Sequence, residues 1–270
     1  MPHSPDGTAY DYRQKHNAPT VIFIHGLGLN RETWSEHLDD YANHYSVLTY
    51  DLCGHGETIL PSHNVNLTLL SEQLYALMQH LKIQKAALIG FSLGGMINRR
   101  FALDHPEHLS ALVILNSPHE RGENAQKLVE QRALDSAAGG PEATIDATLD
   151  RWFTPTFRNR RADMVNWVRK TVLANDKDNY AAHRFTLAAG VKELINPNPS
   201  IQIPSLIITC ENDTGSTPDM SHKIGSEIDG SEVVIVPELQ HLGLLEAPHL
   251  FTSPIIHFLQ RAITAKTGEI

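Results

Sequence analysis

The feature that most constrains this chain is a serine flanked by glycines, at the junction of an aliphatic run and a helical pattern. The segment Gly90-Phe91-Ser92-Leu93-Gly94-Gly95 follows the aliphatic residues 86–89 and precedes a helical pattern over 96–103. The bare G-x-S-x-G pattern occurs by chance in about one chain of this length in ten, so its setting carries the prediction. A strand-to-helix turn this tight strains the serine backbone and requires small neighbours. We therefore predict that Ser92 presents its hydroxyl at a helix N-terminus.

Short β-branched and aliphatic runs recur along the chain and alternate with helical patterns. This alternation is typical of βα units that form a mostly parallel sheet with helices on both faces. We expect an α/β fold with a central sheet of seven to eight strands. Six strands are assigned from the sequence, to residues 21–24, 47–50, 86–89, 112–115, 206–209 and 233–236.

Helices are predicted from apolar spacing and from capping signals. One apolar set recurs every three or four positions, which indicates an amphipathic helix with one face on the sheet. Its members are Leu67, Leu70, Leu74, Leu77, Met78 and Leu81. Thr217-Pro218 and Ser253-Pro254 each place a capping residue before a proline, which predicts helices that begin at Pro218 and Pro254.

The βα alternation stops from about Pro118 to Val191, where a charged, largely helical stretch replaces it. We interpret this stretch as an insertion between two strands. Because the preceding strand ends near Leu115, the insertion is expected over the carboxyl ends of the strands, where such sheets bind ligands. The predicted organisation is a core built from residues 1–117 and 192–270, with a helical cap over 118–191.

Composition excludes several classes of function. Asp and Glu number 31 against 22 Lys and Arg, and the resulting net charge of −9 argues against a nucleic-acid or anionic-membrane partner. No apolar run reaches the ~18 residues that span a bilayer, and the N-terminus has no signal-peptide pattern. Cys53 and Cys210 lie in apolar or motif segments, as buried thiols of a reducing compartment do. We expect a soluble cytoplasmic protein that needs no metal, and self-association is left open.

A serine hydroxyl becomes a good nucleophile only when a base takes its proton, and a carboxylate must orient that base. After a nucleophile on such a turn, the acid and the histidine follow in that order on loops after later strands. Asp213 lies in the loop after residues 206–209, and Glu211, nearer the strand end, is the second choice. His241 lies in the loop after the last predicted strand. The other late histidines fall in or near predicted helices: His222, His249 and His257.

Acyl transfer also needs hydrogen-bond donors for the developing oxyanion, each worth about 3 to 4 kcal/mol. The backbone NH of Leu93, directly after Ser92, is one predicted donor. The second is assigned to the NH of Leu27 in the loop His25-Gly26-Leu27-Gly28, after the strand over 21–24. His25 is expected to hold this loop by hydrogen bonds rather than to exchange protons.

From about residue 20 to its end, the chain resembles the α/β-hydrolase superfamily. The resemblance rests on four motifs in order: His25-Gly26, Asp51-Leu52-Cys53-Gly54-His55-Gly56, Gly90 to Gly95, and Gln240-His241. It implies a sheet of about eight strands, a helical cap, no cofactor, and an acyl-enzyme route through Ser92, Asp213 and His241. It also implies a structural turn at 51–56. The region before Thr20 is short, which leaves the first one or two strands of the family sheet open.

Within the superfamily, the segment from Arg151 to Phe157 is similar to that of the 3-oxoadipate enol-lactonase branch. Trp152 is expected either in the core of the cap or in the wall of the acyl pocket. An enol-lactone of this type carries a free carboxylate, which an inward-facing arginine would bind through charge-assisted hydrogen bonds. The candidates for this role are Arg151, Arg158, Arg160 and Arg161.

The leading interpretation is hydrolysis of a small ester or lactone, with 3-oxoadipate enol-lactone as the first named substrate. Carboxylesterases, thioesterases and carbon-carbon bond hydrolases share the same residues and stay open. Epoxide and haloalkane hydrolases are disfavoured, because they need a carboxylate nucleophile where this chain has Ser92. A ligand-binding or signalling protein without hydrolytic activity is the alternative of another class, since the fold alone does not define function.

Overall fold

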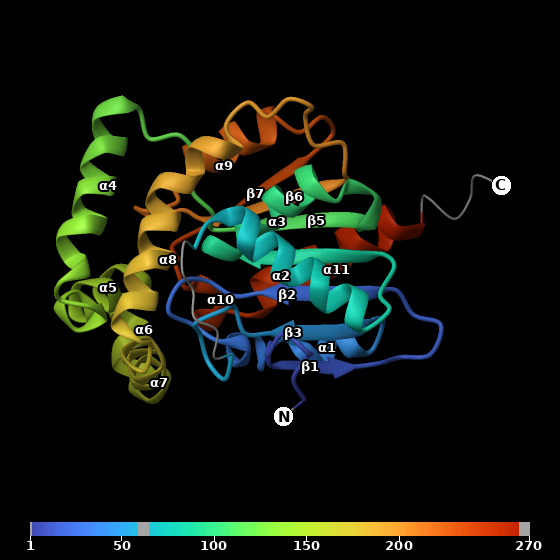
Figure 1. Ribbon diagram of the computed structural model, residues 1–270, viewed down its shortest axis with the longest axis horizontal. Coiled ribbons are helices and arrows are strands. Elements are labelled where there is room, and N and C mark those ends of the chain that lie inside the picture. The colour runs from blue at the N-terminus through green and yellow to red at the C-terminus, as the bar shows by residue number, and fades with distance from the viewer. Residues whose placement is uncertain (1, 59–64, 265–270) are drawn as a thin grey trace.

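A single mixed sheet forms the centre of the protein (Figure 1). The computed structural model describes residues 2–58 and 65–264, and within these ranges the sheet has seven strands in the order β1-β3-β2-β4-β5-β6-β7. Only β1 runs antiparallel to its neighbour in this described sheet. The strands are β1 (Tyr10–Arg13), β2 (Thr20–Ile24), β3 (Ser46–Tyr50), β4 (Ala86–Phe91), β5 (Leu109–Leu115), β6 (Ser205–Cys210) and β7 (Glu232–Val236). The predicted α/β fold with a mostly parallel sheet is confirmed.

The six predicted strands are present as β2 to β7, and β1 is the strand that the sequence did not reveal. β2, β3 and β4 are buried along their whole length, so their sequences are continuous apolar runs. β1 alternates tyrosines with charged residues and is only partly buried. It pairs Tyr10 with Tyr50 and Arg13 with Val47 at one edge of the sheet, so its pattern carries no strong apolar signal.

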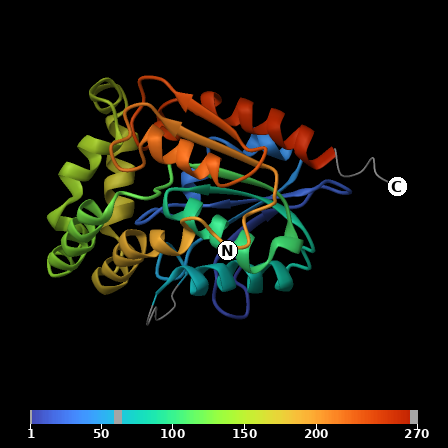
Figure 2. The ribbon, with the colours of Figure 1, turned by 90° about the horizontal axis from the view of Figure 1, so that it is seen from above.

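Helices cover both faces of the sheet (Figure 2). α2 (Leu67–His80) and α3 (Leu93–Asp104) lie on one face, and α11 (His249–Thr264) lies on the other. The predicted apolar face of α2 is fully buried from Leu67 to Met78, and the Asn66 side chain caps its first turn. The other core helices are α1 (Leu38–Ala42), α9 (Pro218–Ser226) and α10 (Gly243–Glu246), with 3-10 turns η1 (Arg31–Trp34) and η2 (Pro106–His108). In the described part of the chain, no helix has the length and apolarity to cross a membrane.

One of the two proline signals marks a helix start, and the other does not. Thr217 caps α9 by accepting a hydrogen bond from the NH of Met220, as predicted. The prediction that the last helix begins at Pro254 is wrong, because α11 begins at His249 and Pro254 lies inside it. The carbonyl of Pro248 already accepts the first amide hydrogen bonds of this helix. Pro254 then removes one intrahelical donor without ending the helix.

Between β5 and β6 the chain leaves the sheet and forms a layer of helices, which we call the insertion (residues 118–191). Its elements are α4 (Glu123–Ala137), η3 (Pro141–Ala143), α5 (Ile145–Trp152), α6 (Pro155–Arg160), α7 (Ala162–Leu173) and α8 (Lys177–Ala189), and η4 (Gly190–Leu194) leads back toward the core. The helices gather at the left end of the sheet in Figure 1, and α4 packs against α8. Because β5 ends at Leu115 and leads directly into this layer, the insertion stands at the carboxyl ends of the parallel strands.

Candidate active site

Ser92 alone makes the turn between β4, which ends at Phe91, and α3, which begins at Leu93. Its backbone has φ 55° and ψ −111°, a combination that side-chain-bearing residues rarely adopt. A Cβ at position 90 would clash with the carbonyl oxygen of Gly94, and a Cβ at position 94 would clash with that of Ile24. The turn therefore requires glycine at both positions, as the sequence predicted.

Ser92 lines a cavity of about 930 Å³ at the carboxyl ends of the strands. The core contributes Leu27, Ser92 and His241 to its wall, and the insertion contributes side chains from α4, α5 and α8. The volume lies in the range of about 300 to 1,000 Å³ that is usual for small-molecule sites. The predicted nucleophile is thus exposed to a space that fits a small organic ligand.

His241 is hydrogen-bonded to Asp213, with 2.6 Å between its Nδ1 and Oδ2 of the carboxylate. Oδ2 also accepts a hydrogen bond from Asn116 Nδ2 at 2.9 Å, and Oδ1 accepts from the NH groups of Gly215 and Ser216. Burial acts to raise the pKa of Asp213, but the charge of His241 and these hydrogen bonds outweigh it and lower the pKa. An ionised Asp213 accepts a hydrogen bond from Nδ1 of His241 and so favours the tautomer with its proton on that nitrogen.

Ser92 and His241 share the cavity wall, and the His241 ring packs against Phe91 and Trp152 at centroid distances of 4.9 and 5.8 Å. Among residues 2–58 and 65–264, Ser92 Oγ has no hydrogen-bond partner, His241 included. Such contacts often tighten only when substrate binds. Glu211, the second choice for the acid, is directed elsewhere: its carboxylate accepts a hydrogen bond from the NH of Glu238.

The two predicted oxyanion donors belong to segments that adjoin Ser92. A Cβ on Gly26 would stand 3.0 Å from Phe91 Cδ1 and 3.3 Å from Ser92 Cβ, so the loop that carries Leu27 lies directly against the turn. Leu93 is the first residue of α3, where amides have no intrahelical acceptor. No other group in the described chain accepts a hydrogen bond from the NH of Leu27 or Leu93. Both donors are available to a ligand oxygen.

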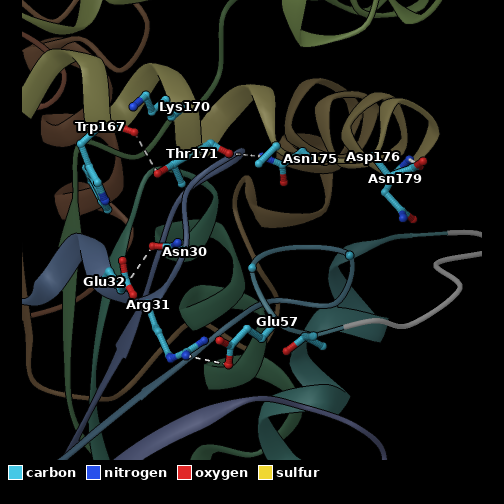
Figure 3. A pocket seen from close by; sticks show the side chains of 14 residues that line it. Asn30, Arg31, Glu32, Glu57, Trp167, Lys170, Thr171, Asn175, Asp176 and Asn179 are labelled. Carbon is cyan, nitrogen blue, oxygen red and sulfur yellow. Dashed lines mark hydrogen bonds and ion pairs between the residues drawn. The ribbon is translucent and has the colours of Figure 1, made fainter. Parts of the chain in front are cut away.

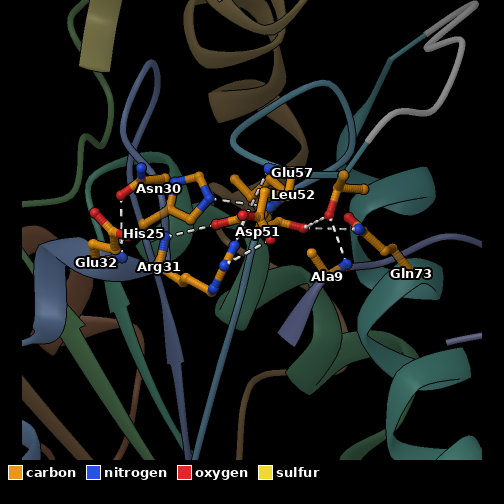
Figure 4. Close-up of polar contacts among 10 residues, drawn as sticks. Ala9, His25, Asn30, Arg31, Glu32, Asp51, Leu52, Glu57 and Gln73 are labelled. Carbon is orange, nitrogen blue, oxygen red and sulfur yellow. Dashed lines mark hydrogen bonds and ion pairs between the residues drawn. The ribbon is translucent and has the colours of Figure 1, made fainter. Parts of the chain in front are cut away.

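His25 holds the loop that follows β2 (Figure 4). Its Nδ1 donates to the carbonyl of Gly26 at 2.8 Å, and its Nε2 accepts from the NH of Leu52 at 3.0 Å. Burial lowers the pKa of His25 and outweighs the opposing charge of Asp51. With both ring nitrogens occupied, His25 is a neutral structural residue, as predicted.

The turn after β3 is a closed charge network (Figure 4). Asp51 is fully buried, forms an ion pair with Arg31, and accepts hydrogen bonds from the NH groups of Arg31 at 2.7 Å and Glu57 at 2.9 Å. The Arg31 guanidinium also contacts Glu57 at 2.9 Å. The one guanidinium is held between the two carboxylates, which supports the structural role that the resemblance implied for this turn.

A smaller cavity of about 580 Å³ lies between this turn and helix α7 (Figure 3). Arg31, Glu57, Trp167 and Lys170 are among the residues that line it. The guanidinium of Arg31 is already occupied by its carboxylate partners, and none of the predicted catalytic residues borders the space. Across residues 2–58 and 65–264, no three His, Cys, Asp or Glu side chains are grouped so that they could hold a metal ion.

Of the four candidate arginines, Arg151 is the one that lines the large cavity. Arg158 forms an ion pair with Asp150, and Arg161 pairs with Asp163 at 3.1 Å. The Arg151 guanidinium lies against the loop after β6, because a Cβ on Gly215 would stand 2.5 Å from its Nη1. The surrounding protein lowers the pKa of Arg151 by desolvation, although the charge of Asp213 opposes this.

Trp152 lies both in the apolar core of the insertion and in the wall of the cavity, the two locations considered from the sequence. It is 6% exposed and belongs to the main apolar cluster, and it also borders the cavity beside His241. The sequence did not single out Arg184 and Tyr180, which α8 brings to the same wall. Their positions follow from the packing of α8 in the folded protein, for which no local motif exists.

The end of α5 is joined to the loop of His241 by hydrogen bonds. The NH of Leu242 donates to the carbonyl of Trp152 at 2.9 Å. Two residues further along, the NH and Oγ1 of Thr154 donate to the carboxylate of Glu246 at 2.8 and 2.6 Å. This junction fixes the insertion to the segment that carries the predicted base.

Three features together define the class of fold: the sheet order, the strained serine turn and the His241–Asp213 pair. This class is the α/β-hydrolase fold. The family described as alpha/beta hydrolase fold matches residues 19–248, and the chain belongs to this family.

The chain is also similar to particular hydrolases of known sequence or structure. It is 26% identical over 244 residues to 3-oxoadipate enol-lactonase 2 of Acinetobacter baylyi, covering 90% of this chain and 89% of that one. It is 24% identical over 247 residues to (E)-2-((N-methylformamido)methylene)succinate hydrolase of the same organism, covering 91% of each. The enol-lactonase from Burkholderia xenovorans LB400 superposes with a TM-score of 0.86 at 26% identity, over 94% of this chain and 96% of that one. The predicted resemblance to the enol-lactonase branch is confirmed.

Proposed function

We propose that this protein is a serine hydrolase that cleaves a small carboxylic ester or lactone through an acyl-enzyme on Ser92. The observation that carries the proposal is the buried His241–Asp213 pair on the wall of the cavity that Ser92 also lines. A strained serine beside an oriented imidazole is the arrangement that acyl transfer requires. The insertion acts as a cap that closes this cavity from the side opposite the sheet.

In the proposed reaction, His241 Nε2 takes the proton of Ser92 Oγ as the oxygen attacks the substrate carbonyl carbon. The NH groups of Leu27 and Leu93 bind the oxyanion of the tetrahedral intermediate. The intermediate collapses, the bond to the leaving oxygen breaks, and His241 returns the proton to that oxygen. Water then attacks the acyl carbonyl with His241 as base, which releases the acid and restores the Ser92 hydroxyl.

The favoured substrate is an ester or lactone that bears a free carboxylate, with 3-oxoadipate enol-lactone as the first candidate. Arg151 supports this choice, because it lines the cavity and has no carboxylate partner among the described residues. A guanidinium binds a carboxylate through two parallel hydrogen bonds. Two of the similar proteins are named for acidic substrates, an oxoadipate lactone and a substituted succinate.

Rapid mixing with a chromogenic short-chain ester tests the mechanism. We expect a burst of released alcohol stoichiometric with enzyme, and its loss in Ser92→Ala. The carboxylate site is tested by Arg151→Ala, which should raise KM for anionic but not for neutral esters. Arg160→Ala is the matched control, since Arg160 is exposed and lies outside the cavity wall. Absence of any Ser92-dependent burst would refute the hydrolase and favour a ligand-binding protein.

A further inference from the structure

A second arginine stands beside Arg151 in the cavity and has no assigned role in the reaction above. Arg184, on α8, lines the same wall as Arg151, on α5. Arg184 Nη1 donates to Thr144 Oγ1 at 3.2 Å, and Tyr180 lines the same wall. In the part of the chain that the structure describes, neither Arg151 nor Arg184 forms a salt bridge.

Both guanidinium groups belong to the same cavity wall, and the charge of Arg184 acts on Arg151. Desolvation is the main cause of the lowered pKa of Arg151, and the charge of Arg184 adds to it. Among the described carboxylates, Asp213 is the one whose charge opposes this shift, and it is hydrogen-bonded to His241. Arg151 is exposed and Arg184 is half-buried, so water screens part of their repulsion, and a bound anion would balance both charges directly.

The rest of the cavity wall carries more positive than negative side chains. Its acidic residues are Glu120 and Asp219, and Glu120 is within 3.4 Å of Lys223. Arg121 and Arg132 add two further guanidiniums, and Arg121 donates to the neutral side chain of Gln126. The positive cavity contrasts with a chain whose net charge is −9. A local excess of this sign attracts and concentrates anionic ligands.

We infer that the substrate carries two anionic groups, one more than 3-oxoadipate enol-lactone, and that Arg184 binds the second group together with Thr144 and Tyr180. On this inference an ester or lactone with two free carboxylates replaces 3-oxoadipate enol-lactone as the preferred substrate. This inference rests on the proposed function, in which Arg151 binds the first. The substrate class is then an ester or lactone of a polycarboxylic acid that keeps two free carboxylates. Beside the Arg184 guanidinium, the hydroxyl groups of Thr144 and Tyr180 can also donate hydrogen bonds to the second anionic group. The volume of about 930 Å³ gives such a branched or extended acid room.

Three aryl esters with matched leaving groups provide the test: a neutral pentanoate, a glutarate monoester with one free carboxylate, and a propane-1,2,3-tricarboxylate monoester with two. We expect kcat/KM of the wild type to be highest for the ester with two carboxylates. Arg184→Gln should lower that value by about 10- to 100-fold, the usual worth of a charged hydrogen bond, and lower the value for the glutarate ester by a much smaller factor. Arg151→Gln should lower the values for both anionic esters.

Arg184→Lys keeps the charge and should restore part of the lost selectivity, and Arg160→Gln should have no effect. Arg184→Gln and Arg184→Lys must first match the wild type in thermal unfolding. The inference is overturned if the wild type does not prefer the ester with two carboxylates, or if Arg184→Gln changes both anionic esters by the same factor.

A binding measurement separates this inference from the proposed function. Calorimetry on Ser92→Ala with the monomethyl esters of propane-1,2,3-tricarboxylate and of glutarate, which keep two carboxylates and one, should show tighter binding of the former, and Arg184→Gln should remove the difference. If no ester is turned over but this preference is found, the proposed function fails and the two-anion site stands. If esters are turned over without the preference, the reaction stands and the second anion site is refuted.

Discussion

Because the backbone at Ser92 is strained, we predict that a glycine at this position makes the folded protein more stable than an alanine does. Ser92→Gly and Ser92→Ala both delete the hydroxyl, which has no hydrogen-bond partner in the described chain, so neither loses such a bond. The two variants differ only in the Cβ. At φ 55° and ψ −111° that Cβ is what makes the backbone unfavourable.

The expected difference follows from two opposing contributions. Backbone strain of this kind costs about 1 to 3 kcal/mol, and glycine relieves it. Glycine also loses about 0.5 to 1 kcal/mol relative to alanine, because its unfolded chain is more flexible. Ser92→Gly should therefore be more stable than Ser92→Ala by about 1 kcal/mol, which corresponds to a higher Tm by roughly 2 to 4 °C in a protein of this size.

Urea unfolding of both variants, followed by circular dichroism, measures the difference. The midpoints should differ while the slopes agree, because a change in slope would indicate an altered unfolded state. Both variants should be inactive on chromogenic esters. If Ser92→Gly is equal to or less stable than Ser92→Ala, the backbone strain at residue 92 is no larger than the cost of glycine, and the predicted stabilisation is refuted.

Three further predictions concern the surroundings of Ser92. Asn116→Gly removes a hydrogen bond to Asp213 and should lower kcat/KM on a chromogenic ester by about 10- to 100-fold; unchanged kinetics would contradict this. The pKa of Asp213 is below its usual 3.8 in the folded protein, so ionised Asp213 stabilises the fold above that pH, and this contribution is lost as pH falls through the folded-state value. Asp213→Asn should thus lose less stability than the wild type between about pH 5 and about pH 3 in urea unfolding, and equal losses would speak against it. Glu246→Gln replaces the ionised acceptor of Thr154 and should destabilise the protein by about 1 kcal/mol in the same assay; no loss would mean that the junction adds nothing to stability.

The fold was readable from the sequence wherever a strand is buried on both faces. β2 to β7 were predicted because burial demands continuous apolar runs, and they vary from the predicted bounds only at their ends. β1 was missed because its partner β3 lies more than 30 residues further along and its own residues alternate in polarity. The start of α11 was predicted wrongly because the Ser253-Pro254 pair is only a local signal. The carbonyl of Pro248 accepts the first amide hydrogen bonds, so the helix begins five residues earlier, at His249.

The site was readable as far as it depends on chain order. Ser92, Asp213 and His241 each follow a strand, so the parallel sheet brings them to one edge, where the structure places them. The sequence left four arginines as candidates for the carboxylate site. Only the position of α5 in the folded protein shows that Arg151 lines the cavity. Arg184 could not be found at all, because its proximity to Arg151 depends on how α8 packs against the rest of the insertion.

The hydrogen bonds from Leu242 to Trp152 and from Thr154 to Glu246 bear on how this protein could be re-engineered. They connect the end of α5, which lines the cavity, to the segment that carries His241. An exchange of residues 118–191 for the equivalent helices of a relative would replace one partner of each of these hydrogen bonds. A graft that keeps Thr154 with Glu246 leaves the imidazole in place while the cavity-facing side chains vary, so specificity can diverge here without a matching change in the machinery of bond cleavage.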